Sequence, residues 1–288
     1  MHTKTLKIIT CHCAFIIMLV YSALSGASLK NLNSPKEILH SIFSDETIND
    51  SIVFKDSGDR QYISWQLDSS KAEMLDEYCM GEYFNHENPN PGYAYSTILG
   101  INKIKTAHDS VAVVFITTTM GSHCHAFSQT FGYALYRKNG TVWIMSAKNY
   151  NLGHIGMYGE IPNVPRTILL AKNQYGFIVQ QRDMEQGSST ETTYIFAMIK
   201  DSLYTSLSIN TYLDDSGAYS DSVKWSYKST LKFKKHPYSR YDDLIVETKG
   251  TQPYDDNTIG HFKETHQYVF TNYKYVDVED LHCDSDGR

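Results

Sequence analysis

The residues whose types and spacing could do chemistry are two histidines that flank a cysteine. His123 and His125 are two positions apart, with Cys124 between them. In an extended strand, residues i and i+2 point to one face, so both imidazoles could bind a single metal ion. A zinc or copper site needs a third protein ligand, and three other histidines qualify by residue type alone: His154, His261 and His266. The alternative, which we favour, is a polar loop beside a disulfide.

Cysteine usage predicts that disulfide. Three cysteines follow the N-terminal segment: Cys79, Cys124 and Cys283. In an oxidising compartment, three cysteines suggest one bridge and one cysteine left over. Cys283 begins a polar tail, 283–288, which we expect to be frayed. We therefore expect Cys79 to pair with Cys124, although the sequence alone does not decide the pairing.

Two other patterns resemble functional motifs but do not meet their requirements. The run 214–217 (DDSG) with Asp221 offers oxygen ligands, yet it lacks the alternating acids and the closing glutamate of calcium loops. The run 187–191 (GSSTE) fails at the last position of the Gly-x-Ser-x-Gly nucleophile elbow. No catalytic residue can be assigned, so we expect a non-enzymatic protein without a cofactor. The alternative is a metal-dependent enzyme centred on His123 and His125.

Residues 1–27 follow the pattern of a secretory signal peptide. Lys4 and Lys7 supply a positive start, 14–20 is a short apolar core, and small residues lead to a cleavage point after Ala27. The apolar run is shorter than the about 20 residues that span a bilayer, and no later run is apolar for long enough. We therefore expect a periplasmic or secreted protein with no membrane span in the mature chain.

The charge balance argues against polyanionic partners. The chain has 26 Lys and Arg against 32 Asp and Glu, a net charge of -6 at pH 7. It also lacks a run of basic residues. Such a chain is not typical of proteins that bind nucleic acid or anionic lipid surfaces.

The first element expected to position these residues is a helix that starts at Pro35. Ser34 is a suitable N-cap, proline fits the first helical position, and Glu37 completes a capping box. A second helix is expected over 70–79 from a similar pairing of serine and glutamate. Both would lie in a lead-in segment, 28–95, before the strand-rich part of the chain.

Hairpins dominate the remainder. Asn139 and Gly140 predict a type I′ turn between strands 131–136 and 142–148, because both residue types tolerate positive φ. Two later stretches, 194–207 and 268–276, repeat the same alternation of aromatic and aliphatic residues.

The predicted fold is therefore mainly β. We expect an antiparallel meander of hairpins, arranged as propeller-like blades or alternatively as a β-sandwich, with one or two short N-terminal helices. The hairpins of 96–280 and the lead-in 28–95 together would form a single domain, 28–282.

Tyrosine is abundant, with 22 in the chain. Most belong to ordinary strand composition. Where the rings lie in loops they supply rigid, amphipathic contact area for a partner protein. Four are predicted to do so: Tyr93, Tyr95, Tyr219 and Tyr254.

The chain resembles a loosely defined family of exported bacterial β-rich proteins. The likeness spans roughly 95–280. It is carried by these segments: 122–126 (SHCHA), 158–162 (YGEIP), 176–178 (GFI), 186–187 (QG), 215–217 (DSG), 225–229 (WSYKS), 241–246 (YDDLIV) and 250–251 (GT). Some members are encoded beside type VI or contact-dependent effectors, and the resemblance implies an immunity role.

These observations predict a secreted or periplasmic protein that binds another protein. In its sharpest form it is an immunity or inhibitor protein whose partner is a cognate toxin or effector. The alternatives are the metal-dependent enzyme at His123 and His125 and a structural envelope protein.

Overall fold

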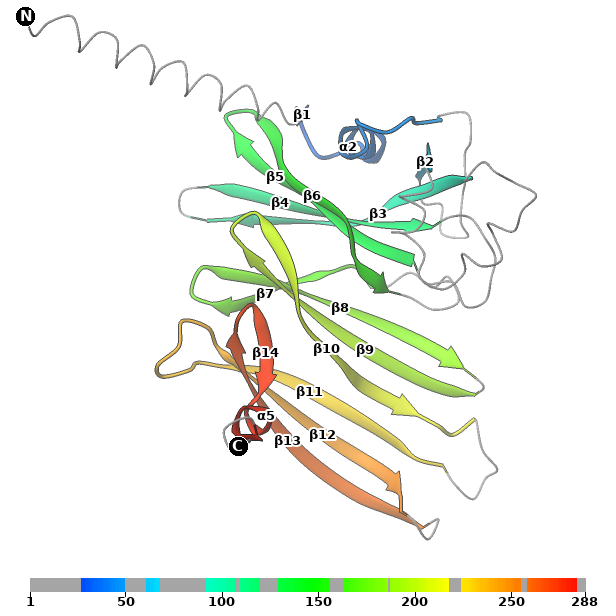
Figure 1. The fold of residues 1–288 in the computed structure, drawn as a ribbon, viewed down its shortest axis with the longest axis vertical. Helices are drawn as coiled ribbons and strands as arrows, with labels where there is room; N and C mark the ends of the chain where they lie inside the picture. The colour runs from blue at the N-terminus through cyan, green and yellow to red at the C-terminus, as the bar shows by residue number, and fades with distance from the viewer. Residues whose placement is uncertain are drawn as a thin grey trace, which may run out of the picture.

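The computed structural model describes residues 27–49, 61–67, 92–106, 109–119, 129–155, 163–185, 187–217, 224–254 and 258–283. These residues form two antiparallel sheets, stacked face to face, with two short helices at their margins (Figure 1). The mainly β fold is therefore confirmed. Among the described residues, no helix is long and apolar enough to cross a membrane.

The first sheet has six strands in the order β1-β6-β5-β4-β3-β2. Its strands are β1 (Ser28–Leu29), β2 (Tyr62–Gln66), β3 (Tyr93–Lys105), β4 (Ser110–Thr119), β5 (Gln129–Asn139) and β6 (Val142–Ile155).

The second sheet has eight strands that follow one another in chain order. Its strands are β7 (Arg166–Ala171), β8 (Gln174–Glu185), β9 (Ser188–Ile199), β10 (Ser202–Asp214), β11 (Ser226–Lys234), β12 (Asp243–Pro253), β13 (Ile259–Thr271) and β14 (Lys274–Asp277). A short helix, α5 (Val278–Cys283), follows the last strand.

The predicted N-terminal helix is present as α2 (Pro35–Ile42). The Glu37 backbone amide donates a hydrogen bond of 3.3 Å to the Ser34 hydroxyl, the cap that the sequence predicts. The helix covers the side of the six-stranded sheet that faces away from the second sheet (Figure 1). Phe43, just after the helix, stacks on Trp65 and Tyr150 at centroid distances of 5.1 and 5.0 Å.

A buried tyrosine joins this helix to the sheet. The hydroxyls of Tyr136 on β5 and Ser41 on α2 are 2.5 Å apart. Burial disfavours the phenolate and raises the pKa of Tyr136 to about 12, although the hydrogen bond with Ser41 works in the opposite direction. Tyr136 is therefore a neutral hydrogen-bonding group at physiological pH.

Strand β4 is buried on both faces, which explains its continuous apolar run. Ala112, Val114 and Ile116 pack toward α2. The alternate residues, Val113 and Phe115 among them, pack toward the second sheet.

The contact between the two sheets is aromatic. Phe115 meets Phe177 edge-on at 5.0 Å, and Phe131 stacks on both Phe115 and Phe196 at 5.5 and 5.3 Å. All four rings are at most 1% exposed. These rings hold the face of β8 and β9 against the six-stranded sheet.

The turn at Gly140 differs from the prediction by one residue. Asn139 pairs with Val142, so the two turn residues are Gly140 and Thr141. Of these two, only Gly140 has a positive φ, 58°, which is the φ pattern of type II′ rather than type I′. The pattern with positive φ at both positions occurs instead in the β13–β14 turn, at Asn272 (48°) and Tyr273 (68°).

The three similar hairpins do not form separate blades. The β5–β6 hairpin belongs to the six-stranded sheet, while β9–β10 and β13–β14 are both in the eight-stranded sheet. The arrangement is closer to the sandwich alternative, because one aromatic layer joins two continuous sheets. The predicted second helix at 70–79 and the predicted signal segment lie outside the described residues, apart from Ala27.

Replacing Phe177 with alanine should test the aromatic layer. We expect the free energy of unfolding to fall by about 3–5 kcal/mol, since a fully buried ring is lost and the two sheets cannot close the gap. Chemical denaturation followed by tryptophan fluorescence measures the change. The control is Leu169→Ala, at a side chain that is 55% exposed, for which we expect a change within about 0.5 kcal/mol. Equal effects would contradict the assignment.

Candidate ligand-binding site

The residues predicted to bind metal or to form the disulfide lie mostly outside the described part of the chain. His123, His125, Cys79 and Cys124 are among them, so both sites stay predictions. The three auxiliary histidines are described but do not come together as a set. His154 is on β6 in the first sheet, whereas His261 and His266 are on β13 in the second.

The predicted partner-binding tyrosines are in different settings. Tyr93 and Tyr95 are half-buried residues of β3, where they pair with β2. Tyr254 follows β12 and is 50% exposed. Tyr219 lies outside the described residues.

A cavity in the eight-stranded sheet arises from an interruption in its strand pairing. Only 212–214 of β10 pair with β11, opposite 226–228. Beyond these pairs the two strands separate, so 229–234 of β11 have no β10 partner. The sheet therefore curls into a half-barrel whose concave face is left partly unfilled.

The far end of the half-barrel is closed by contacts between distant strands. The Asp242 backbone amide donates a 2.7 Å hydrogen bond to the Leu170 carbonyl, which ties the start of β12 to the end of β7. Tyr241 stacks on Phe270 at 4.1 Å, and the Tyr275 hydroxyl donates to the Asp242 carbonyl at 3.1 Å. Burial, with the nearby negative charges of Asp242 and Asp243, raises the pKa of Tyr275, so its hydroxyl stays protonated.

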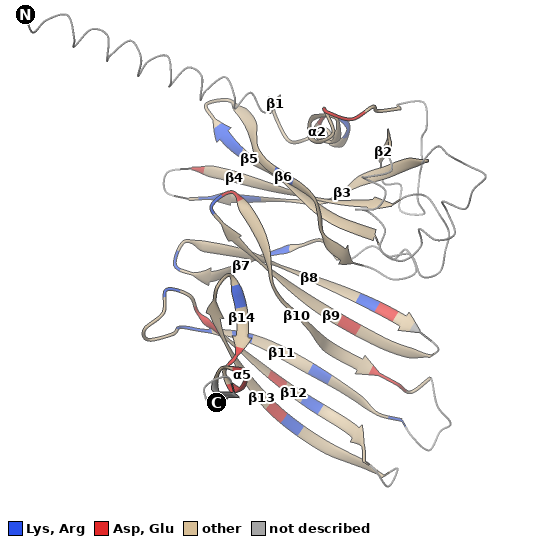
Figure 2. Ribbon diagram, viewed as in Figure 1, with Lys and Arg blue, Asp and Glu red and all other residues tan. Residues whose placement is uncertain are grey.

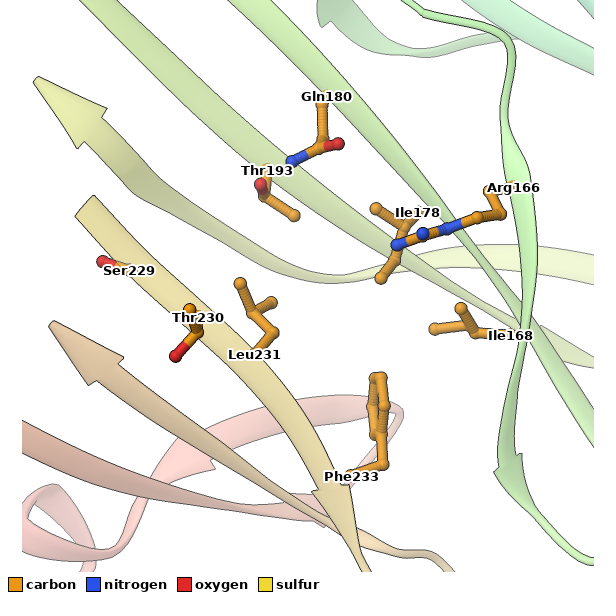
Figure 3. A pocket seen from close by; sticks show the side chains of 9 residues that line it. All are labelled: Arg166, Ile168, Ile178, Gln180, Thr193, Ser229, Thr230, Leu231 and Phe233. Atoms are coloured by element: carbon orange, nitrogen blue, oxygen red, sulfur yellow. The ribbon is translucent and has the colours of Figure 1, made fainter.

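The cavity has a volume of about 380 Å³ and lies between β7–β9 on one side and β11 on the other (Figure 3). Apolar side chains line it from both walls: Ile168, Ile178, Leu231 and Phe233. Polar residues complete the lining: Arg166, Gln180, Thr193, Ser229 and Thr230. On β11, Ser229, Leu231 and Phe233 share one face because they are two residues apart.

Most polar groups around the cavity are already paired with neighbours. The Gln180 amide donates to Glu191 at 2.9 Å. The hydroxyls of Thr193 and Thr211 are 2.8 Å apart, as are those of Ser229 and Thr248. These bonds fix the side chains in place, so the polar part of the lining is preorganised.

Arg166 is the exception. It is exposed at the start of β7, and its side chain extends from β7 toward the space in front of Ile178 (Figure 3). It forms no ion pair with any residue that the structure describes. A guanidinium presents several donors in a planar fork suited to carboxylate or phosphate. The cavity thus combines four apolar side chains with a guanidinium that forms no ion pair among the described residues.

A second cluster lies apart from this cavity. Among the described residues, one group of three side chains could offer ligands to a metal ion: His266, Asp277 and Glu279, with their ligand atoms within 4.8 Å of one another. His266 Nδ1 already lies 2.9 Å from Asp277 Oδ2. The arrangement is that of a hydrogen-bonded pair beside an exposed glutamate.

The cavity has no recognisable signature in the sequence. Its residues are ordinary strand residues, and the alternation Tyr227, Ser229, Leu231, Phe233 shows only that one face of β11 is partly apolar. The early end of the β10–β11 pairing, which creates the space, has no signature in either strand alone.

Comparison with known proteins adds no family assignment. No family model matches the chain, and neither a curated protein nor a solved structure is found to be similar to it.

A substitution at Gly176 should test the packing below the cavity. A Cβ there would lie 2.7 Å from the Phe196 carbonyl oxygen and 2.8 Å from Leu170 Cδ1. Since the Phe196 backbone is held by the aromatic layer, we expect Gly176→Ala to destabilise the fold by about 1–3 kcal/mol in thermal or denaturant unfolding. Gly92→Ala is the control, because no atom lies within 4 Å of its Cβ position. An unchanged stability of Gly176→Ala would contradict this prediction, because it would show that Phe196 and Leu170 can move to accommodate the added Cβ.

Proposed function

We propose that this protein is a non-enzymatic binding protein that holds a small amphipathic ligand in the concave side of its eight-stranded sheet. The observation that carries the proposal is the cavity between β7–β9 and β11. Its volume falls within the range of about 300–1,000 Å³ that is common for small-molecule sites.

The lining favours a ligand with a mainly apolar body. Ile168 and Ile178 come from the wall formed by β7–β9, and Leu231 and Phe233 come from the opposite wall, β11 (Figure 3). Transfer of apolar ligand surface from water to such walls is favourable by roughly 25 cal/mol per Å². An aliphatic or aromatic portion of the ligand would occupy this part of the cavity.

Arg166 favours one negative group on the same ligand. Charge-assisted hydrogen bonds from a guanidinium to a carboxylate or phosphate are about twice as strong as neutral ones. The other polar residues of the lining can orient this head group through hydroxyl and amide groups. The ligand class is thus an amphipathic anion, such as an acyl chain with a carboxylate.

The lining also supports binding rather than catalysis. It contains no imidazole, thiol, carboxylate or ammonium group. General acid–base catalysis or covalent catalysis would need one of these groups, or an activated hydroxyl, within reach of the ligand. The hydroxyls of Thr193 and Ser229 instead bond to other threonines.

An environment-sensitive fluorescent fatty acid should bind to the purified protein. We expect saturable fluorescence enhancement that unlabelled fatty acid competes away. Leu231→Arg should weaken binding more than tenfold, because it places a charge in the apolar lining. Leu231→Trp, which fills the space without a charge, should also weaken it.

The matched control is Thr265→Arg, at an exposed position of β13. This variant should bind the probe as the wild type does. Binding that survives both Leu231 variants would place the ligand elsewhere on the protein and contradict the proposal.

Recognition of a protein partner is a second candidate, in line with the resemblance to exported immunity-type proteins. It is supported by a pair of stacked tyrosines, Tyr204 and Tyr273, with ring centroids 4.8 Å apart and exposures of 39% and 50%. Stacking makes the pair rigid, which lowers the entropy cost of using it in an interface. Export through the 1–27 segment is part of this proposal.

The product of the neighbouring reading frame is the partner to test. We expect it to bind in calorimetry and to lose at least tenfold in affinity with a Tyr204→Ala, Tyr273→Ala double variant, since aromatic anchors dominate interfaces. Tyr238→Ala, at a residue that is 95% exposed, is the control and should change nothing. If the double variant binds equally well, this pair is not the contact.

The metal-dependent enzyme at His123 and His125 and the structural envelope role remain alternatives that rest on the sequence. Elemental analysis of the purified protein distinguishes the first of them, because it requires stoichiometric zinc or copper.

A further inference from the structure

The outer face of β11–β13 is rich in lysine although the chain as a whole is acidic. Along β11, Lys228, Lys232 and Lys234 are exposed and alternate with the residues that line the cavity. They therefore point away from the cavity. Lys249 on β12 and Lys263 on β13 are also exposed.

Strand register brings three of these lysines into one row. Lys228 pairs directly with Lys249, and Lys249 pairs directly with Lys263. Figure 2 shows basic positions side by side on these three strands. Like charges directly opposite one another are destabilising in a sheet. The row therefore lowers the stability of the fold. It cannot be recognised in the sequence, because the three lysines come together only through strand pairing.

Two acidic residues of β12, Asp243 and Glu247, lie on the same face as these lysines, and each already has partners. Glu247 lies 3.2 Å from Lys232. Asp243, which is 4% exposed, lies within hydrogen-bonding distance of His236 and accepts a hydrogen bond from Gln267. Asp214 accepts from Tyr212 and from a backbone amide in its own turn. Lys228, Lys249 and Lys263 form no ion pair within the described part of the chain.

We propose that this lysine face, Lys228, Lys232, Lys234, Lys249 and Lys263, docks the protein on an anionic lipid surface. Clusters of four to eight basic residues are typical of binding to anionic head groups. Lysine suits such a surface because it is a mobile, hydrated point charge that needs no fixed partner geometry.

The composition of the face argues against a protein or a nucleic acid as its partner. Protein interfaces are enriched in aromatic residues and arginine and depleted in lysine. Nucleic-acid grooves for single strands add aromatic rings on which bases stack. Exposed positions beside these lysines include the hydroxyl and amide residues Thr230, Thr265 and Gln267, and the exposed ring next to Lys263 is the imidazole of His261. These lysines attract a negatively charged surface by their charge and need no specific contacts with individual head groups.

The face is independent of the cavity but lies on the other side of the same strand. Ser229, Leu231 and Phe233 face the cavity, while the alternate residues of β11 carry the lysines. A protein docked in this way holds the wall of its cavity against the membrane. The proposal stands whether or not the cavity takes an amphipathic ligand.

The test is co-sedimentation of the full chain with vesicles. We expect binding to vesicles of phosphatidylglycerol and phosphatidylcholine, and none to phosphatidylcholine alone. The triple variant Lys228→Gln, Lys249→Gln, Lys263→Gln should lower the partition coefficient by about 100-fold, from about 1 kcal/mol for each lysine. Raising the salt from 0.1 to 1 M shortens the Debye length from about 10 to about 3 Å and should also release the protein.

A charge-matched control removes three exposed lysines elsewhere: Lys30, Lys103 and Lys172. It should bind as the wild type does. The Leu231→Arg variant should also bind, which separates docking from ligand uptake. Thermal unfolding should show that the triple variant is as stable as the wild type or more stable, because a like-charge row has been removed.

Three outcomes would overturn the proposal: equal binding to neutral vesicles, equal loss in the control triple variant, or binding to duplex DNA without binding to vesicles.

Discussion

The rest of the structure depends on the aromatic layer between the two sheets. Phe115 and Phe131 from one sheet meet Phe177 and Phe196 from the other, and their burial commits one face of β8 and β9 to the interior. The opposite face of these strands is then the only one left for the cavity. Each of these large rings also buries a large apolar area.

Given that layer, each sheet has a distinct role. The six-stranded sheet is covered on its outer side by α2, with Trp65 and Phe43 filling the space, so its central strands β4 and β5 are buried on both faces. The eight-stranded sheet is covered on one side only. Its concave side leaves a cavity, while the lysines of β11–β13 point away from that cavity, and Figure 2 shows charged positions of both signs along these strands.

Much of the local structure could be predicted from the sequence. The capping residues at the start of α2 predict that helix, because capping is a local interaction between Ser34 and Glu37. The alternation of apolar and polar residues likewise predicts most strands, because it is a local property of the sequence. The sequence predicts the turn at Gly140 one residue too early, because the pairing of Asn139 with Val142 depends on the register of whole strands.

The candidate sites could not be predicted in this way. The cavity depends on where β10 and β11 stop pairing, and the lysine row depends on the register of three strands. The absence of a basic run led to the expectation that anionic surfaces are excluded. Lys228, Lys249 and Lys263 are far apart in the chain, and only sheet pairing brings them together.

The short junction between β10 and β11 has a mechanical consequence. The two parts of the eight-stranded sheet are joined by three residue pairs, together with a few hydrogen bonds across the gap, from Ser206 to Tyr273 and from Asp242 to Leu170. Each such bond contributes about 0.5–1.5 kcal/mol. The two parts are also joined by a buried apolar cluster, in which Leu170, Ile178 and Ile195 of β7–β9 pack with Leu244, Val246 and Tyr275 of β12–β14. Widening the half-barrel would separate this cluster and expose it to water, so apolar packing, rather than the three residue pairs, fixes the width of the cavity.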